Sequence, residues 1–136
     1  MIVLLDTSIW SLAFRRKTSD LAAGQQEQMR TLEELLAQGR ARLLGPIRQE
    51  LLSGLRSWQQ FVRLREKLRP FPDVELETED YEDAAQISNT CRRHGITGGP
   101  VDFLLCSVAL RRGWAIYTSD RDFERYAKHI PVLLYS

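Results

Sequence analysis

Acidic residues follow two of the apolar runs in this 136-residue sequence, close to the point where each run ends. Asp6 comes directly after Met1–Leu5, and Asp120 comes shortly after Trp114–Tyr117. Short aliphatic runs of this kind are typical of strands that are buried on both faces of a parallel sheet. In open parallel sheets, ligand sites lie just beyond the carboxyl ends of the strands. Either carboxylate could also serve only as the N-cap of the helix that follows it, because Asp is a favoured capping residue.

Asp102 is harder to explain as a structural residue. It lies near the start of an apolar helix predicted over residues 100–112, and a helix that is apolar almost all round is buried on most sides. An ionised carboxylate in such a place costs several kcal/mol unless it is paired or bound to a cation. The positive end of the helix offsets only about 0.3–1 kcal/mol of that cost. Two explanations remain open for Asp102: a structural salt bridge, and a metal-binding or catalytic role.

Glu50 joins these three acids because of where its helix begins. It lies one turn into a helix that Gly45-Pro46 opens after a predicted strand, so it points to the same edge of the sheet. A Glu that simply faces solvent is the alternative. Four carboxylates gathered at one edge repel one another unless a divalent cation neutralises them.

The kind of cation follows from the other possible ligands. With two cysteines and two histidines in the chain, a zinc site built from Cys and His is disfavoured, and oxygen ligands favour Mg²⁺ or Mn²⁺. Such an ion can polarise a phosphodiester and lower the pKa of a bound water that attacks phosphorus. The four acids therefore suggest phosphodiester hydrolysis.

Strands and helices alternate along the sequence, which predicts an α/β fold with a central, mostly parallel sheet and helices on both faces. Strands are predicted at the N-terminal run and over 42–44, 114–117 and 132–134, with a weaker one over 74–76. Helices are predicted over 8–14, 20–38, 58–68, 100–112 and 121–128, and from residues 45 and 78 onwards.

Two of these helices show further sequence signals. Ser57 with Gln60 forms a capping-box pattern, and Thr78 is the predicted N-cap of its helix. The predicted buried side of the helix from Thr78, which Gly95 ends, carries Tyr81, Ala84, Ala85, Ser88 and Cys91.

Composition is that of an ordinary globular protein, with 43% hydrophobic and 27% charged residues, and the length predicts one domain over residues 1–136. No apolar run approaches the length of a membrane span, so we expect no membrane association and a cytoplasmic protein. In that compartment Cys91 and Cys106 are expected to be reduced residues of the core.

Charge is unevenly distributed, although the net charge is +1. Residues 73–83 hold seven acids and no Lys or Arg, which leaves 19 basic residues against 11 acids elsewhere. Sixteen of the basic residues are Arg, whose planar guanidinium suits phosphate recognition. This excess suggests a nucleic-acid partner, with a composition bias of the source genome as the alternative explanation.

The chain resembles a PIN domain, in particular the VapC type of bacterial toxin, in the order of its four acids: Asp6, Glu50, Asp102 and Asp120. The matching segments are Leu5–Trp10, Arg48–Leu51, Gly99–Asp102 and Thr118–Phe123. Each segment alone is a carboxylate with a loose flank, and the ordered set, which spans the whole chain, is what makes the resemblance specific. The sequence departs from the family in the bulky residues 103–105, where smaller side chains are common.

This resemblance implies a Mg²⁺- or Mn²⁺-dependent endoribonuclease on a three-layer α/β/α sandwich. It assigns the four acids to the metal-binding catalytic pocket, Asp122 to an auxiliary carboxylate, and the hydroxyls of Thr7 and Thr118 to orienting water or a carboxylate. It also implies an RNA substrate, a homodimer, and a small cognate antitoxin that holds the toxin inactive. The candidate contacts to RNA phosphates, each otherwise a solvated surface charge, are Arg15, Arg16, Lys17, Arg92, Arg93 and Arg121.

Other classes of protein fit the sequence less well. A PIN-like module of weak catalytic activity would only bind RNA or protein, and the presence of all four acids argues against it. A haloacid-dehalogenase-type phosphatase would need a second carboxylate two residues after the first, where this chain has Ser8. A receiver-type phospho-acceptor domain would need an Asp pair near the start and a Lys at a late strand end, and Lys128 is not so placed.

Overall fold

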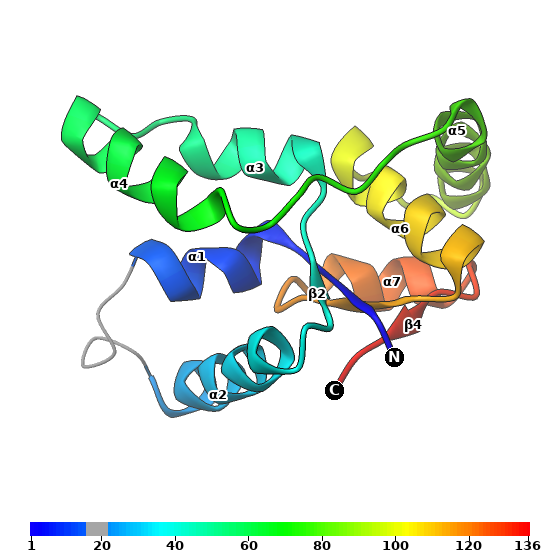
Figure 1. Ribbon diagram of the computed structural model, residues 1–136. Helices are drawn as coiled ribbons and strands as arrows, with labels where there is room; N and C mark the ends of the chain where they lie inside the picture. Colours follow the sequence, from blue (N-terminus) through cyan, green and yellow to red (C-terminus); the bar gives the residue numbers. More distant parts are fainter. Residues whose placement is uncertain (16–21) are drawn as a thin grey trace.

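A computed structural model describes residues 1–15 and 22–136, apart from the side chain of Arg15 (Figure 1). Its central sheet is parallel, in the order β2-β1-β3-β4, with strands Val3–Leu5 (β1), Ala41–Arg42 (β2), Ala115–Tyr117 (β3) and Leu133–Leu134 (β4). β1 and β3 pair with Val3 opposite Ala115 and Leu5 opposite Tyr117, so the residues that follow the two strands emerge side by side. The predicted parallel sheet is confirmed.

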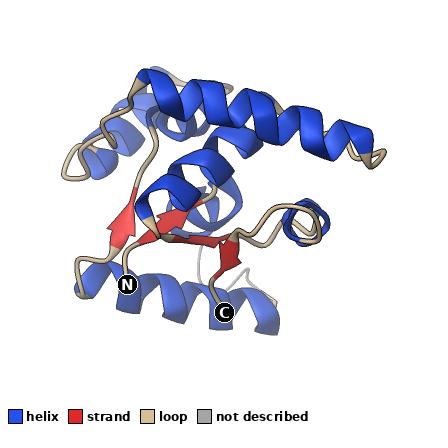
Figure 2. Ribbon diagram, turned by 90° about the vertical axis from the view of Figure 1, so that its right-hand side faces the viewer, coloured by secondary structure: helices blue, strands red, loops and turns tan. Residues whose placement is uncertain are grey.

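Helices cover both faces of this sheet. The described helices are α1 (Thr7–Arg15), α2 (Ala23–Ala37), α3 (Gly45–Leu52), α4 (Trp58–Leu68), α5 (Thr78–Arg93), α6 (Pro100–Arg112) and α7 (Asp122–Ala127). α2 lies on one side of the sheet, and α5 and α6 lie on the other (Figures 1 and 2). The predicted three-layer α/β/α fold is confirmed.

The core is centred on β1 and α6. Val3, Leu4 and Leu5 are fully buried, and residues 103–109 of α6 are all buried, as expected for a helix that is apolar almost all round. Removing apolar surface from water stabilises the fold by about 25 cal/mol per Å². Asp6 and Asp102 extend from the ends of these two elements, so the most deeply buried part of the molecule fixes their backbones.

The weaker strand predicted over residues 74–76 is not formed. A single bridge joins Leu43 and Asp73, supported by a hydrogen bond from the Val74 N–H to the Leu43 carbonyl (3.0 Å). β2 ends at Arg42 and the chain turns into α3 at Gly45, so no partner strand continues beside residues 74–76. The N-cap of α5 is Glu77 instead of the predicted Thr78, which is the first helical residue, whereas Ser57 caps α4 as predicted.

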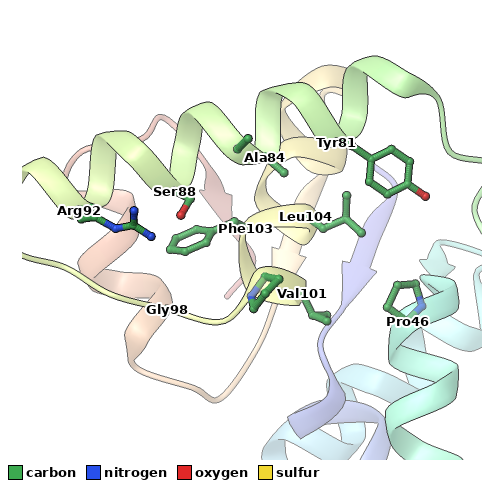
Figure 3. Close-up of a pocket in the computed structure, with 11 residues that line it drawn as sticks. Pro46, Tyr81, Ala84, Ser88, Arg92, Gly98, Val101, Phe103 and Leu104 are labelled. Atoms are coloured by element: carbon green, nitrogen blue, oxygen red, sulfur yellow. The ribbon is translucent and has the colours of Figure 1, made fainter.

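The predicted buried face of α5 is only partly correct: Cys91 is buried and Ala84 packs partly buried against the core, whereas Tyr81 and Ala85 are exposed. The buried residues of this helix are Asp80, Ile87 and Cys91, while Tyr81 is 55% exposed. The small residues Ala84, Ala85 and Ser88 lie with Tyr81 along a groove of about 520 Å³ that α6 residues line on the other side (Figure 3). The stripe of small residues therefore marks the wall of a groove.

An ion cluster around Asp80 explains why α5 turns a different face toward the core than the sequence predicts. Asp80 is fully buried and accepts hydrogen bonds from Arg111 Nε (2.9 Å) and from Arg112 Nη1 and Nη2 (2.8 and 2.9 Å). The Ser107 hydroxyl donates to the Asp80 carbonyl (2.7 Å). The hydrogen bonds from Arg112 are the main reason that the pKa of Asp80 falls to about 2. Part of the acidic segment thus clamps α5 onto the end of α6.

Both cysteines are free and buried, which confirms the expectation of reduced core thiols. Burial raises the pKa of Cys91, and it raises the pKa of Cys106 to about 12. None of the described helices combines the length and the apolar character that crossing a membrane requires.

Candidate active site

Asp6 is held by hydroxyl groups at the end of β1. Its side chain is almost fully buried, and Oδ2 accepts hydrogen bonds from Thr118 Oγ1 (2.8 Å) and Ser8 Oγ (3.1 Å). The Asp6 carbonyl accepts from the N–H groups of Ile9 (3.0 Å) and Trp10 (3.2 Å), which starts α1. The backbone of Asp6 therefore begins the helix, while its carboxylate is oriented by the end of the neighbouring strand.

Asp120 is linked to Asp6 through Thr118. The Thr118 hydroxyl that donates to Asp6 also accepts from the Asp120 N–H (2.9 Å). Oδ1 of Asp120 in turn accepts from the Asp122 N–H (2.9 Å). The pairing of β1 with β3 places these groups together, so the predicted meeting of two strand-end acids at one sheet edge is observed.

Asp102 enters the same site from the first turn of α6, where it is half-buried. Tyr126 donates a hydrogen bond from its hydroxyl to Asp102 Oδ2 (2.9 Å). Burial is the main reason that the pKa of Asp102 rises to about 6, and the negative charges of Asp6, Asp120 and Asp122 add to the rise, which the Tyr126 hydrogen bond opposes. No Lys or Arg among the described residues forms an ion pair with Asp102, so the salt-bridge explanation finds no support there.

Glu50 stands apart from the other three acids. It is exposed on α3, and its Oε2 accepts a hydrogen bond from Thr7 Oγ1 (2.7 Å). Thr7 follows Asp6 directly, so this hydrogen bond connects Glu50 to the β1 end of the site. Glu50 is not among the charges that raise the pKa of Asp102.

The predicted auxiliary and basic residues lie in different places. Asp122 is half-buried and pairs with Arg125 (2.6 Å). Arg121 lines a hollow of about 280 Å³ together with Thr118 and Asp120. Arg92 and Arg93 are exposed at the end of α5, where Arg92 lines the groove of Figure 3. Arg16, Lys17 and the side chain of Arg15 lie outside the described part of the chain.

The chemistry of these side chains suits a hard divalent cation. The donors are carboxylate oxygens, and hydroxyl groups orient three of the carboxylates: Asp6, Glu50 and Asp102. Three acids, Asp6, Asp120 and Asp122, disfavour the negative charge of Asp102. The hydrogen-bond donor to Asp102 is the neutral hydroxyl of Tyr126. Within the described ranges, no three acidic, His or Cys side chains are near enough to form a ready-made ion site.

The spacing of the acids in the sequence does not identify two further residues of the site, Ser8 and Tyr126. Ser8 donates to Asp6 and accepts from the Ser119 N–H (3.1 Å), and its place two residues after a strand-end Asp is a local signal that could have found it. Tyr126 lies 24 residues from Asp102, and only the folded arrangement of α6 and α7 shows that they meet.

The chain was compared with protein-family models, curated proteins and solved structures. A model described as PIN domain matches residues 3–129. No curated protein matches the sequence.

Solved structures with the same fold come from several bacteria. The chain is similar to FitAcB from Neisseria gonorrhoeae at 19% identity, with 99% of this chain and 97% of that chain covered and a TM-score of 0.77. It is similar to DNA-bound VapBC from Salmonella typhimurium at 20% identity, with coverage of 100% and 97% and a TM-score of 0.72. It is also similar to VapBC2 from Rickettsia felis bound to a promoter DNA fragment, at 20% identity, coverage of 99% and 98% and a TM-score of 0.73. At these identities the structures show the shared fold, and the family match over nearly all of the sequence shows that the chain belongs to the PIN domain family.

Proposed function

We propose that this protein is an endoribonuclease that hydrolyses RNA phosphodiesters with the help of Mg²⁺ or Mn²⁺. The observation that carries the proposal is the environment of Asp102, a half-buried carboxylate whose charge is disfavoured by Asp6, Asp120 and Asp122 and which has no basic partner in the described residues. A carboxylate that repels its acidic neighbours and has no basic partner is stabilised by a cationic ligand. Membership of the PIN domain family supports nuclease activity in particular.

Asp6, Asp102, Asp120 and Glu50 would hold the cation, with Asp122 as an auxiliary carboxylate. When bound, a divalent cation supplies a Lewis acid for the phosphodiester and a bound water of lowered pKa. Thr118 and Ser8 fix the orientation of the Asp6 carboxylate, and Thr7 does the same for Glu50. Arg121, which shares a hollow with Asp120, would contact a phosphate of the substrate. Hydrolysis would leave a 5′-phosphate and a 3′-hydroxyl.

The biological setting we propose is a toxin–antitoxin pair. The similar structures are described as FitAB and VapBC complexes, three of them bound to DNA, and one further neighbour as a toxin–antitoxin complex from Klebsiella pneumoniae. We propose that the chain is a VapC-type toxin restrained by a cognate antitoxin, as these similarities support, and that it acts as a homodimer. Arg92 and Arg93, together with Arg15, Arg16 and Lys17, remain candidate contacts for RNA.

The direct test is cleavage of labelled RNA by the purified protein in the presence of Mn²⁺. Asp6→Ala and Asp102→Asn should each lower the cleavage rate by about a hundredfold or more, because the charge stabilisation that a bound metal supplies is worth several kcal/mol. Glu33→Gln, which changes an exposed acid on α2, is the matched control and should cleave at the wild-type rate.

Two results would contradict the assignment. Equal cleavage by wild type and Asp102→Asn would show that the acids do not catalyse the reaction. RNA binding by the wild type without any metal-dependent cleavage would favour the alternative, a catalytically weak PIN-like binding module.

A further inference from the structure

We infer that Tyr126 is a positioning residue for Asp102, and that Gly98 keeps open the space that the Tyr126 hydroxyl occupies. This inference rests on the proposed metal-dependent function of the acids. It assigns a role in the site to two residues that carry no carboxylate.

Tyr126 is held in one place by the core. It is fully buried on α7, and its ring contacts Phe103 (5.1 Å between centroids) and Phe123 (5.3 Å). Its hydroxyl donates to Asp102 Oδ2 at 2.9 Å. A buried tyrosine hydroxyl needs a hydrogen-bond partner, and here that partner is a carboxylate of the site.

The hydrogen bond from Tyr126 gives the two carboxylate oxygens of Asp102 different roles. Oδ2 of Asp102 is occupied by Tyr126, which restricts rotation of the carboxylate about its Cβ–Cγ bond. The other oxygen, Oδ1, is thereby given a fixed direction for a ligand. Hydrogen bonds of this kind to metal-binding carboxylates commonly set both the orientation and the affinity of the site.

α7 links the contact between Tyr126 and Asp102 to the acids that follow β3. The helix begins at Asp122, two residues after Asp120, so the element that carries Tyr126 also carries Asp122 and starts close to Asp120. A shift of α7 would move Tyr126 and Asp120 together. Tyr126 therefore fixes the position of Asp102 relative to Asp120 and Asp122.

Gly98 is the residue whose size limits this arrangement. It lies in the loop that leads into α6 (Figure 3). A Cβ at this position would stand 2.8 Å from Cζ of Tyr126 and 2.9 Å from Cζ of Phe103, and closer still to the tyrosine hydroxyl. Because both rings are buried, any larger residue at position 98 must displace the hydroxyl or the loop. At the neighbouring Gly99, a Cβ would meet no described atom within 4 Å.

The test measures Mn²⁺ binding to the folded protein by electron paramagnetic resonance of the free ion. Tyr126→Phe keeps the ring and removes the hydroxyl, and it should weaken Mn²⁺ binding by about tenfold, the lower end of the range for losing such a supporting hydrogen bond. Gly98→Ala should weaken binding in the same direction by displacing the hydroxyl. Gly99→Ala and Tyr81→Phe, which change a neighbouring glycine and an exposed tyrosine, should bind Mn²⁺ like the wild type.

A purely structural role for Tyr126 would lower the melting temperature without changing the Mn²⁺ dissociation constant of the folded protein, so the two readouts separate the explanations. Wild-type affinity in Tyr126→Phe would overturn the inference and leave the proposed function intact. A wild type that binds no Mn²⁺ would overturn both. If Tyr126→Phe does not fold, equal affinities of Gly98→Ala and Gly99→Ala would overturn the inference.

Discussion

At the scale of single residues, Asp102 is in an environment that disfavours its own charge. Its partial burial is the main reason that its pKa rises to about 6, the charges of three acids add to the rise, and Tyr126 supplies a hydrogen bond without a positive charge. An aspartate of the unfolded chain ionises near pH 4. The ionised carboxylate that the proposed function needs therefore costs the metal-free fold some of its stability.

Asp102→Asn should consequently stabilise the metal-free protein at neutral pH, although it lowers the cleavage rate. The amide oxygen of Asn can still accept the Tyr126 hydrogen bond, and the repulsion from three acids is removed. We expect a gain of about 1–2 kcal/mol in the free energy of unfolding, less than the full pKa shift implies because Asp102 is partly solvated. Urea unfolding at pH 7.5 in the presence of EDTA measures it.

The control for this substitution is Asp122→Asn. Asp122 has Arg125 as a partner, so its replacement should bring no gain in stability. Lower stability of Asp102→Asn than of the wild type would mean that the interactions of the carboxylate outweigh its desolvation and repulsion.

Residues of the site differ in how far the sequence reveals them. Asp6 and Asp120 are predictable because the end of a buried strand is a local signal, and the apolar flanks of Asp102 make its carboxylate conspicuous. Tyr126 and Gly98 belong to the same site through contacts between α6, α7 and the loop before α6. Nothing in the local spacing of these two residues encodes such a contact.

At the scale of elements, the sequence predicts most helices and the parallel sheet, because both depend on hydrophobic period and on stop signals such as Gly113 (φ 69°). It fails for the orientation of α5. A stripe of small residues on a helix predicts its core face, although here a buried carboxylate decides which face turns inward. Asp80 could not be recognised as buried from sequence, since its partners, Arg111 and Arg112, lie on another helix.

The ion cluster on α5 gives a prediction for Asp80→Asn. Removing one partner of a buried ion cluster should destabilise the protein at pH 7 by about 3 kcal/mol, at the low end of the usual range because Arg111 and Arg112 are partly exposed. The folded pKa of about 2 lies below that of an unfolded aspartate, so the stabilisation is complete above about pH 5 and is lost as the pH falls toward 2. The stability difference between wild type and variant should shrink over the same interval.

Urea unfolding of both proteins between pH 2 and pH 7 checks this dependence. Asp83→Asn is a suitable control, because Asp83 is more exposed and its contact with Arg111 is longer, at 3.5 Å. A difference in stability that stays constant across the whole pH range would show that Asp80 acts through something other than its charge.

At the scale of the whole molecule, one continuous core joins the acids to the far end of α5. It includes Leu4 of β1, Cys106 of α6 and Cys91 of α5, all fully buried. The Asp80 cluster and the candidate active site lie toward opposite ends of α6, one at Arg111 and Arg112 and one at Asp102. Destabilising the first should therefore loosen the core that supports the second.

The two thiols provide a probe of that core. Both are fully buried and burial raises the pKa of each, so a thiol reagent should reach them only when the structure opens. At pH 8 we expect labelling of the native protein to be slower than labelling in denaturant by several orders of magnitude. Asp80→Asn should accelerate the native labelling by about a hundredfold, which is its expected loss of stability expressed as a population of open molecules. If Cys91 alone reacted quickly while Cys106 stayed protected, α5 would open independently of α6, and the Asp80 cluster would not couple the two helices.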